Sequence, residues 1–173
     1  MKSNTTLRSK TSGSNAEKTP YTDRQKALST LQSYCAYQDR CHQEARQKLR
    51  DMGVFPDWIE EIITELIQDN FLNEERFARS YARGKFKMKR WGRNRIKQEL
   101  KRRQISAYCI KKGLSEIDED EYRQVMEAEL LRRHTQEKKA KHPWLRRRKL
   151  VDYMVKRGYE AGLLWPLLDE LGI

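Results

Sequence analysis

The chain has 173 residues, of which 36% are charged and 37% hydrophobic, a balance that argues against one deep spherical core and favours thin layers of helices. Its formal net charge of +12 and its pI near 9.7 exceed what solubility requires and indicate a polyanionic partner, with nucleic acid as the commonest and an acidic protein or a membrane surface as alternatives. Only 8 glycines and 4 prolines interrupt a sequence rich in strong helix formers, so we predict an all-α fold.

The polar start of the chain shows no targeting segment. Residues 1–20 are rich in Ser, Thr and Lys, lack the apolar centre of a secretory signal and end at Pro20, so we expect a disordered tail. No run along the chain approaches the roughly 18 apolar residues that a membrane span needs. The 3 cysteines, an odd number, are typical of a reducing compartment. We therefore expect a cytoplasmic protein that has no membrane partner.

Residues 21–71 are predicted to form a first unit of three short helices. The second of these should run from about Gln43 to Met52, because Gly53 suits the cap position that follows a helix. Pro56 suits the start of the third helix, and Asn70 should end it. Apolar residues at helical spacing predict which sides face the core. They are Leu28, Leu31 and Cys35 in the first helix, and Ile59, Ile62, Ile63, Leu66 and Ile67 in the third.

Two further units are predicted at residues 72–116 and 117–173. The second unit opens at Asn73, a preferred helix-capping residue, and two glutamates follow it where a helix dipole favours acids. Trp91-Gly92 separates its first helix from the next. The third unit begins in the acidic stretch "DEDEY". The residues of the second unit expected to face inward are Phe77, Ala78, Tyr81, Ile96 and Leu100.

Self-similarity along the chain supports this division into units. Ala27–Gly53 aligns with Ala78–Gln104 without a gap, at an offset of 51 residues. A looser third copy places Met154 at the position of Leu100, at an offset of 54, and needs a larger insertion around "TQEKKAKHP". We therefore predict three tandem three-helix repeats, of which the third is divergent.

The charge pattern changes between the repeats while the apolar pattern is kept. From Glu44 to Glu75 acids outnumber bases, whereas from Arg79 to Arg103 Glu99 is the only acid among twelve bases. Such a run is either a solvated coat or the electrostatic footprint of a polyanion or an acidic protein, and we predict the footprint. This basic strip consists of Arg79, Arg83, Lys85, Lys87, Lys89, Arg90, Arg93, Arg95, Lys97, Lys101, Arg102 and Arg103.

A second basic cluster surrounds Trp144. This ring either stacks on a nucleic-acid base, worth roughly 1 to 3 kcal/mol, or covers a site where helices pack, and packing is the commoner role. Trp91 is assigned to the core, because it precedes Gly92 at a turn. The cluster itself consists of Lys138, Lys139, Lys141, Arg146, Arg147, Arg148 and Lys149.

No motif for catalysis or cofactor binding stands out. Cys35, Cys41 and His42 offer three metal ligands, whereas a structural zinc site uses four, so we expect no metal. His134 and His142 are isolated, and no nucleophile or carboxylate stands at a spacing that suggests catalysis. A phosphate-binding glycine loop is also missing. We predict a protein that is not an enzyme and needs no cofactor.

One stretch carries a family resemblance. Leu66–Ser106, "LIQDNFLNEERFARSYARGKFKMKRWGRNRIKQELKRRQIS", resembles the central signature of the RecX family of bacterial recombination regulators. Asn73 and Glu74 stand where the family has an aspartate pair, and Arg103 and Gln104 replace Lys-Gly. The similarity covers about residues 22–115, and the remainder follows only the looser third repeat. The matching residues are Leu72, Arg76, Phe77, Ala78, Gly92, Arg95, Ile96, Glu99, Leu100 and Ile105.

The resemblance implies an elongated, curved stack of three-helix repeats. RecX proteins bind the RecA recombinase, typically in the groove of its filament on single-stranded DNA, and limit its ATPase and strand-exchange activities. It therefore implies a non-enzymatic regulator with RecA and single-stranded DNA as partners, and we expect a monomer. The motif residues Arg76 and Arg95 either contact the partner or tie helices together through acids such as Glu75 and Glu99.

Two other functions remain open from the sequence. A stand-alone nucleic-acid-binding helical module would explain the charge equally well. Recognition of duplex DNA by a helix-turn-helix-like pair within one unit is a weaker alternative, because the repeat already explains short helices joined by a glycine turn.

Overall fold

A computed structural model describes residues 23–136 and 142–173 of the chain. Within these residues the secondary structure consists of nine helices and no strands, so the all-α prediction is confirmed. The predicted tail, residues 1–20, lies outside the described residues. The helices are α1 (Arg24–Tyr37), α2 (His42–Asp51), α3 (Pro56–Gln68), α4 (Glu74–Lys89), α5 (Arg93–Arg102), α6 (Ala107–Leu114), α7 (Glu119–Gln136), α8 (Pro143–Lys156) and α9 (Ala161–Glu170).

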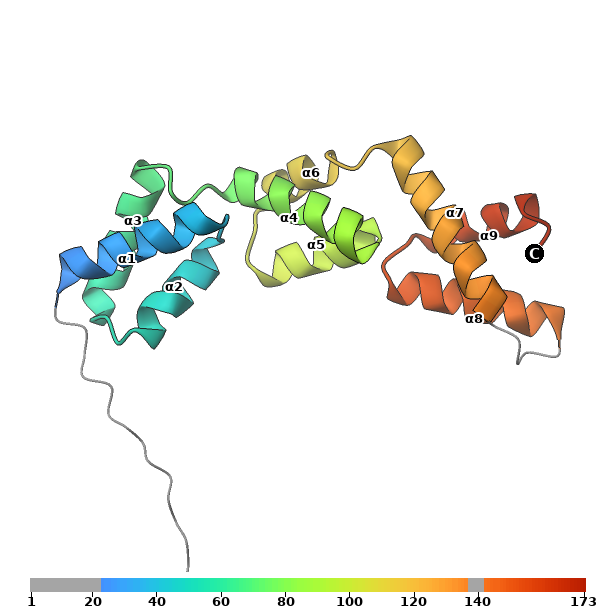
Figure 1. Cartoon of the computed structure of the whole chain (residues 1–173), viewed down its shortest axis with the longest axis horizontal. Helices are drawn as coiled ribbons and strands as arrows, with labels where there is room; N and C mark the ends of the chain where they lie inside the picture. Colours follow the sequence, from blue (N-terminus) through green and yellow to red (C-terminus); the bar gives the residue numbers. More distant parts are fainter. Residues whose placement is uncertain (1–22, 137–141) are drawn as a thin grey trace, which may run out of the picture.

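The helices follow one another as three groups along the longest axis of an elongated, curved array (Figure 1). We call α1–α3 unit 1, α4–α6 unit 2 and α7–α9 unit 3. The array of three tandem three-helix repeats is the architecture that the sequence predicted. The predicted boundaries, 71/72 and 116/117, stay a prediction and fall in the connections between α3 and α4 and between α6 and α7.

The middle helix of each unit ends in the same backbone motif. At the end of α2, Val54 N–H donates to Leu49 O at 3.1 Å and Gly53 N–H donates to Arg50 O at 2.9 Å, which is a Schellman cap. α5 and α8 end in the same way. The residues with a left-handed backbone at the three ends are Gly53 (φ 74°), Gln104 (φ 59°) and Gly158 (φ 96°). The residues that accept the longer bond, Leu49, Leu100 and Met154, are all fully buried, so the repeat read from the sequence is present in the backbone.

The apolar residues form two cores among the described residues. Unit 1 has a core of its own, and units 2 and 3 share a second one that extends from Phe77 to Leu168. In α3, Ile67 was predicted to face the core and is 45% exposed, which corrects that prediction. Ile67 lies at the edge of the stripe formed by the four other predicted residues, which are buried.

Units 1 and 2 meet at a junction that we call the first joint, and side chains hold it. Asp39 accepts a hydrogen bond from Arg76 Nε at 2.8 Å and another from Ser80 Oγ at 2.7 Å. Arg103 Nε lies 3.7 Å from a carboxylate oxygen of Glu44. The Cys41 side chain is buried in the core of units 2 and 3. The first joint therefore combines ion pairs with one apolar contact.

Units 2 and 3 meet at the second joint, where backbone contacts backbone. Gly92 N–H donates to Arg157 O at 2.9 Å, and Asn94 N–H donates to Gly158 O at 3.0 Å. Tyr159 Oη donates to Arg90 O at 3.0 Å. A Cβ added to Gly92 would lie 2.2 Å from the carbonyl carbon of Gly158. Glycine is therefore required at position 92, because the two chain segments approach too closely for any side chain.

Candidate partner-binding surface

The basic strip lies on α4 and α5 of unit 2. Asn73 caps α4 as predicted, since its side chain accepts a hydrogen bond from Arg76 N–H at 2.9 Å. Arg90 ends α4 with a left-handed backbone (φ 53°), and Gly92 begins α5 as its cap. The break between the two helices falls at residues 90–92, so the end of α4 and the start of α5 meet at one end of unit 2 (Figure 1).

Arg79 and Arg83 are neutralised by acids of their own chain. Arg79 pairs with Glu75 at 2.7 Å and also with Glu116, and Arg83 pairs with Glu116 at 3.0 Å. The hydrogen bond from Arg79 and the positive charge of both arginines hold the pKa of Glu116 below its usual value. These two arginines therefore connect α4 to the end of α6, and much of their charge is neutralised there.

Three further arginines of the strip also have acidic partners. Arg93 lies 2.9 Å from Glu119 and stacks on the ring of Tyr122. Arg102 and Arg103 both pair with Glu99 at 2.9 Å. The hydrogen bond from Arg103 comes first among the causes that lower the pKa of Glu99. The single acid of the strip is therefore ionised and held by its neighbours.

The remaining cations of the strip have no carboxylate partner among the described residues. Three of them belong to the second half of α4, one is its cap, and three belong to α5. Most of these side chains are exposed. The structure thus divides the predicted strip into a neutralised part and a part that keeps its charge for a partner. We call the second part the unpaired cations, namely Lys85, Lys87, Lys89, Arg90, Arg95, Lys97 and Lys101.

The two arginines of the family-like motif have structural partners. Arg76 ties unit 2 to unit 1 through Asp39, 37 residues away, rather than through Glu75, and it also donates to the carbonyls of residues 70 and 71. Arg95 stacks on the ring of Trp91 at 4.1 Å from its centroid, rather than forming an ion pair with Glu99. Contact of these residues with a partner stays a prediction.

Cations and aromatic rings alternate along one face of α4 and α5. Arg103 lies 4.8 Å from the centroid of Tyr81, and Lys85 lies 5.1 Å from Tyr81 and 5.4 Å from Trp91. With Arg95 on the far side of Trp91, the series is cation, ring, cation, ring, cation. Trp91 is partly buried against the core, in line with its predicted assignment. Tyr81 was predicted only as a core residue, and its second role here is a finding of the structure.

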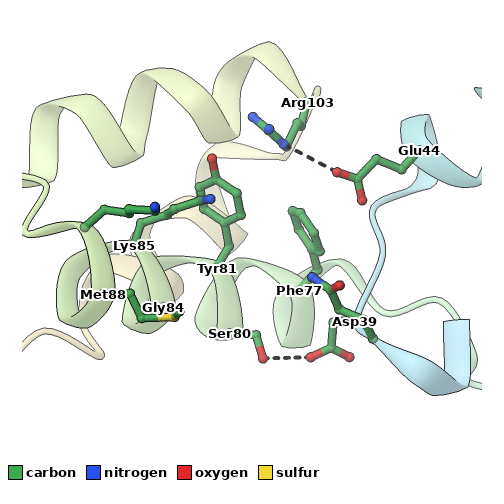
Figure 2. Close-up of a pocket in the computed structure, with 11 residues that line it drawn as sticks. Asp39, Glu44, Phe77, Ser80, Tyr81, Gly84, Lys85, Met88 and Arg103 are labelled. Carbon is green, nitrogen blue, oxygen red and sulfur yellow. Dashed lines mark hydrogen bonds and ion pairs between the residues drawn. The ribbon is translucent and has the colours of Figure 1, made fainter.

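A groove with a volume of about 430 Å³ lies beside this series, at the first joint (Figure 2). Asp39 and Glu44 line it from unit 1, while Lys85, Met88 and Arg103 line it from unit 2. In Figure 2 Met88, Gly84 and Ser80 follow α4 along one side, and Tyr81, Lys85 and Arg103 lie opposite. The groove thus joins an acidic end to a basic end.

The second basic cluster is partly neutralised in unit 3. Arg146 donates to His134 O at 2.9 Å, and Arg147 pairs with Asp169. Arg148 lies 5.6 Å from the centroid of Trp144, whose ring is 57% exposed. Trp144 therefore does not fill a packing site. Lys138, Lys139 and Lys141 lie outside the described residues.

The two cysteines of unit 1 have structural roles. Cys35 is buried as predicted, and burial raises the pKa of its thiol to about 11. The Cys41 sulfur accepts a hydrogen bond from Glu44 N–H at 3.4 Å and caps α2. Among the residues that the structure describes, no three potential ligands form a group that could hold a metal ion. The same residues contain no helix long and apolar enough to cross a membrane.

Comparisons with known proteins single out one family. Residues 73–114 match the family model of the RecX second three-helix domain. The regulatory protein RecX of Bacillus cytotoxicus is 30% identical over 148 residues, which cover 85% of this chain and 54% of that protein. The RecX protein of Bacillus cereus (strain B4264) gives the same values. The chain spans about half the length of the curated relatives that it matches.

Solved structures show the same fold. The crystal structure of RecX from Lactobacillus salivarius has a TM-score of 0.71 at 22% identity, covering 86% of this chain and 96% of that one. A crystal structure of regulatory protein RecX has a TM-score of 0.78 at 19% identity, covering 84% and 71%.

Fold and surface define the class of this protein as a tandem array of three-helix repeats with a basic central unit. The family that it resembles is RecX, as the central motif predicted, and the match to a family model lies in the central unit. The second three-helix domain of that family matches the unit that carries the unpaired cations, and the matching relatives are named regulatory proteins.

Proposed function

We propose that this protein is a non-enzymatic regulator that binds the RecA recombinase filament on single-stranded DNA and limits its ATPase and strand-exchange activities. The observation that supports this most directly is the set of unpaired cations on unit 2, the unit that matches a RecX domain. The array is elongated (Figure 1), and most of these cations are exposed on its surface. That geometry fits a helical polymer made of protein and DNA, which the protein would contact as a monomer.

A charge reversal on α5 tests this function. Lys97 and Lys101 are exposed, lie one turn apart and have no carboxylate partner among the described residues. The variant Lys97→Glu/Lys101→Glu should weaken inhibition of RecA-dependent ATP hydrolysis on single-stranded DNA without unfolding the chain. The matched control, Lys26→Glu/Lys48→Glu, makes the same change in net charge on exposed positions of unit 1 and should inhibit like the wild type. Wild-type protein that leaves ATP hydrolysis unchanged at stoichiometric amounts would refute the proposal.

The unpaired cations favour a stand-alone nucleic-acid-binding module as the second candidate. The salt dependence of binding distinguishes the two candidate functions. A protein that only neutralises phosphates loses affinity for naked DNA steeply as salt rises, with a logarithmic slope of about 0.9 per phosphate neutralised. Filament binding should need RecA and should depend less on salt. A pull-down with RecA filaments and with bare single strands, side by side at moderate salt, therefore identifies the partner.

A further inference from the structure

The groove at the first joint carries an unbalanced charge. Its carboxylates already have partners, since Asp39 accepts from Arg76 and Ser80, and Glu44 accepts from Cys41 N–H at 3.3 Å. The lysines of the groove, at positions 85 and 89, have no carboxylate partner among the described residues. The groove therefore attracts a negatively charged group at its unit 2 end.

The floor of the groove is open at Gly84. This residue lies inside α4, where glycine is less stable than alanine. A Cβ added there would meet no atom within 4 Å, whereas one added to Gly113 would meet the backbone of Ala78 at 2.7 Å. The fold thus explains the glycine at 113 and leaves the one at 84 unexplained. A glycine whose surroundings are empty lets the backbone of another molecule come close to the helix.

An apolar contact stands one turn beyond this opening. Met88 follows Gly84 by four residues, lines the groove and is 80% exposed. Methionine is flexible and polarizable, so it adapts to apolar side chains of different shapes. The aromatic edge formed by Phe77 and Tyr81 lines the same groove. An occupant that fits must therefore bring apolar atoms as well as negative charge.

We propose that this groove binds an acidic peptide segment of the protein partner, with its backbone over Gly84, an apolar side chain against Met88 and a carboxylate at Lys85 or Lys89. The proposal rests on the proposed function in that the segment belongs to the partner of this regulator. Nucleic acid fits less well, because the phosphate backbone has no apolar side chain to place against the exposed Met88. A peptide can place its acids over the lysines alone.

Substitution of Gly84 tests the groove directly. Gly84→Leu places a side chain on the open floor, where its Cβ meets no atom within 4 Å, and favours the helix. The probe is a fluorescein-labelled octapeptide of alternating glutamate and leucine, followed by fluorescence anisotropy. We expect the wild type to bind it and Gly84→Leu to bind at least about tenfold more weakly. Ser33→Leu, which introduces the same side chain at the equivalent exposed position of unit 1, should bind like the wild type, and Gly84→Ala should bind with an affinity between those of the wild type and Gly84→Leu.

Each outcome decides the proposal. Equal affinity of Gly84→Leu and wild type, or a wild type that does not bind the octapeptide, overturns it. A Gly84-dependent affinity for octathymidylate that exceeds the affinity for the peptide shows that the occupant is nucleic acid and also overturns it. Because these measurements contain no recombinase, their result is independent of whether the protein inhibits RecA.

Discussion

The two joints of the array are held together by different kinds of contact. At the second joint, backbone groups of residues 92 and 94 bond to backbone groups of residues 157 and 158, and the cores of units 2 and 3 are continuous. At the first joint, ion pairs of Asp39 and Glu44 connect two separate cores, apart from the buried Cys41 side chain. Units 2 and 3 thus form one packed body, and unit 1 is attached to it by side chains.

The closely packed joint and the joint that contains the groove are therefore different joints. At Gly92 the contacts between backbones leave no space for a side chain between units 2 and 3, as the close approach to Gly158 shows. Contacts between long side chains hold units 1 and 2 apart and leave the groove between them. The joint held by side chains is therefore also the one that contains the groove with its two lysines.

Inserting a side chain at Gly92, in the second joint, gives the largest predicted effect. In Gly92→Val the new Cβ would lie 2.2 to 2.3 Å from backbone atoms of Gly158 and Tyr159, which cannot move like a side chain. We expect the free energy of unfolding to fall by about 3 kcal/mol, measured by urea denaturation. The control, Gly84→Ala, adds a Cβ in open space and should raise it by about 0.5 to 1 kcal/mol. A Gly92→Val protein as stable as the wild type would mean that the second joint is loose.

Removing the ion pair of the first joint should cost less and change the shape more. Arg76→Ala loses the contact with Asp39, and since the Arg76 side chain is 40% exposed, we expect a loss of about 1 kcal/mol. Unit 1 should then sample more orientations, which raises the radius of gyration in small-angle X-ray scattering. A double-mutant cycle with Asp39→Ala isolates the pair, and a coupling energy near zero would show that other contacts hold the joint.

Acidification should weaken the first joint as well. His42 begins α2, its Nε2 atom is buried without a hydrogen-bond partner, and burial lowers the pKa of its imidazole despite the nearby Glu74. A base whose pKa is lower in the folded state binds fewer protons there than in the unfolded chain. Its contribution to stability is therefore complete above the unfolded pKa of about 6.5 and is lost as pH falls through that value toward the folded one.

The variant His42→Gln measures this contribution. Between about pH 7.5 and about pH 5.5, the midpoint of thermal unfolding of the wild type should fall more than that of His42→Gln. The difference should be smaller than the effect of Arg76→Ala. His134, whose pKa burial also lowers, supplies the control, because His134→Gln should leave the contribution of His42 in place. Parallel pH profiles for the wild type and His42→Gln would contradict the assignment.

The sequence predicted the architecture because local rules determine it. Apolar spacing, Asn73 at a helix start and glycine at two of the three Schellman caps that end the middle helices are local signals, and each is found in the structure. The joints were not predicted, because their partners are distant in sequence. Asp39 and Glu116 each lie 37 residues from the arginine that they neutralise. Counting charges between Arg79 and Arg103 therefore missed Glu116, which lies outside that range.

One signal in the repeat alignment does mark the joints. Arg103 and Arg157 occupy the same position, just before the left-handed residue, at the offset of 54 that relates units 2 and 3. Each reaches back to the preceding unit, Arg103 to Glu44 and Arg157 to the carbonyl of Lys89. Unit 1 has Met52 at this position, and none of the described residues forms a unit before it. A cation at this position thus accompanies a preceding unit, although the offset alone does not identify its acceptor.

The smallest predicted effect lies at the one Schellman cap that lacks glycine. Gln104 has a left-handed backbone (φ 59°), whereas the equivalent residues of units 1 and 3 are glycines. A left-handed backbone costs an ordinary residue about 1 to 2 kcal/mol, and glycine removes that cost. Part of this gain is lost, because glycine has greater conformational freedom in the unfolded chain. Gln104→Gly should therefore raise the free energy of unfolding by about 0.5 kcal/mol. Because Gln104 is exposed and takes no part in the ion pairs of the first joint, urea denaturation should show this gain in the wild type and in Arg76→Ala alike. A gain that disappears in Arg76→Ala would mean that the turn and the first joint are coupled, and that the weaker joint extends beyond its ion pairs into unit 2.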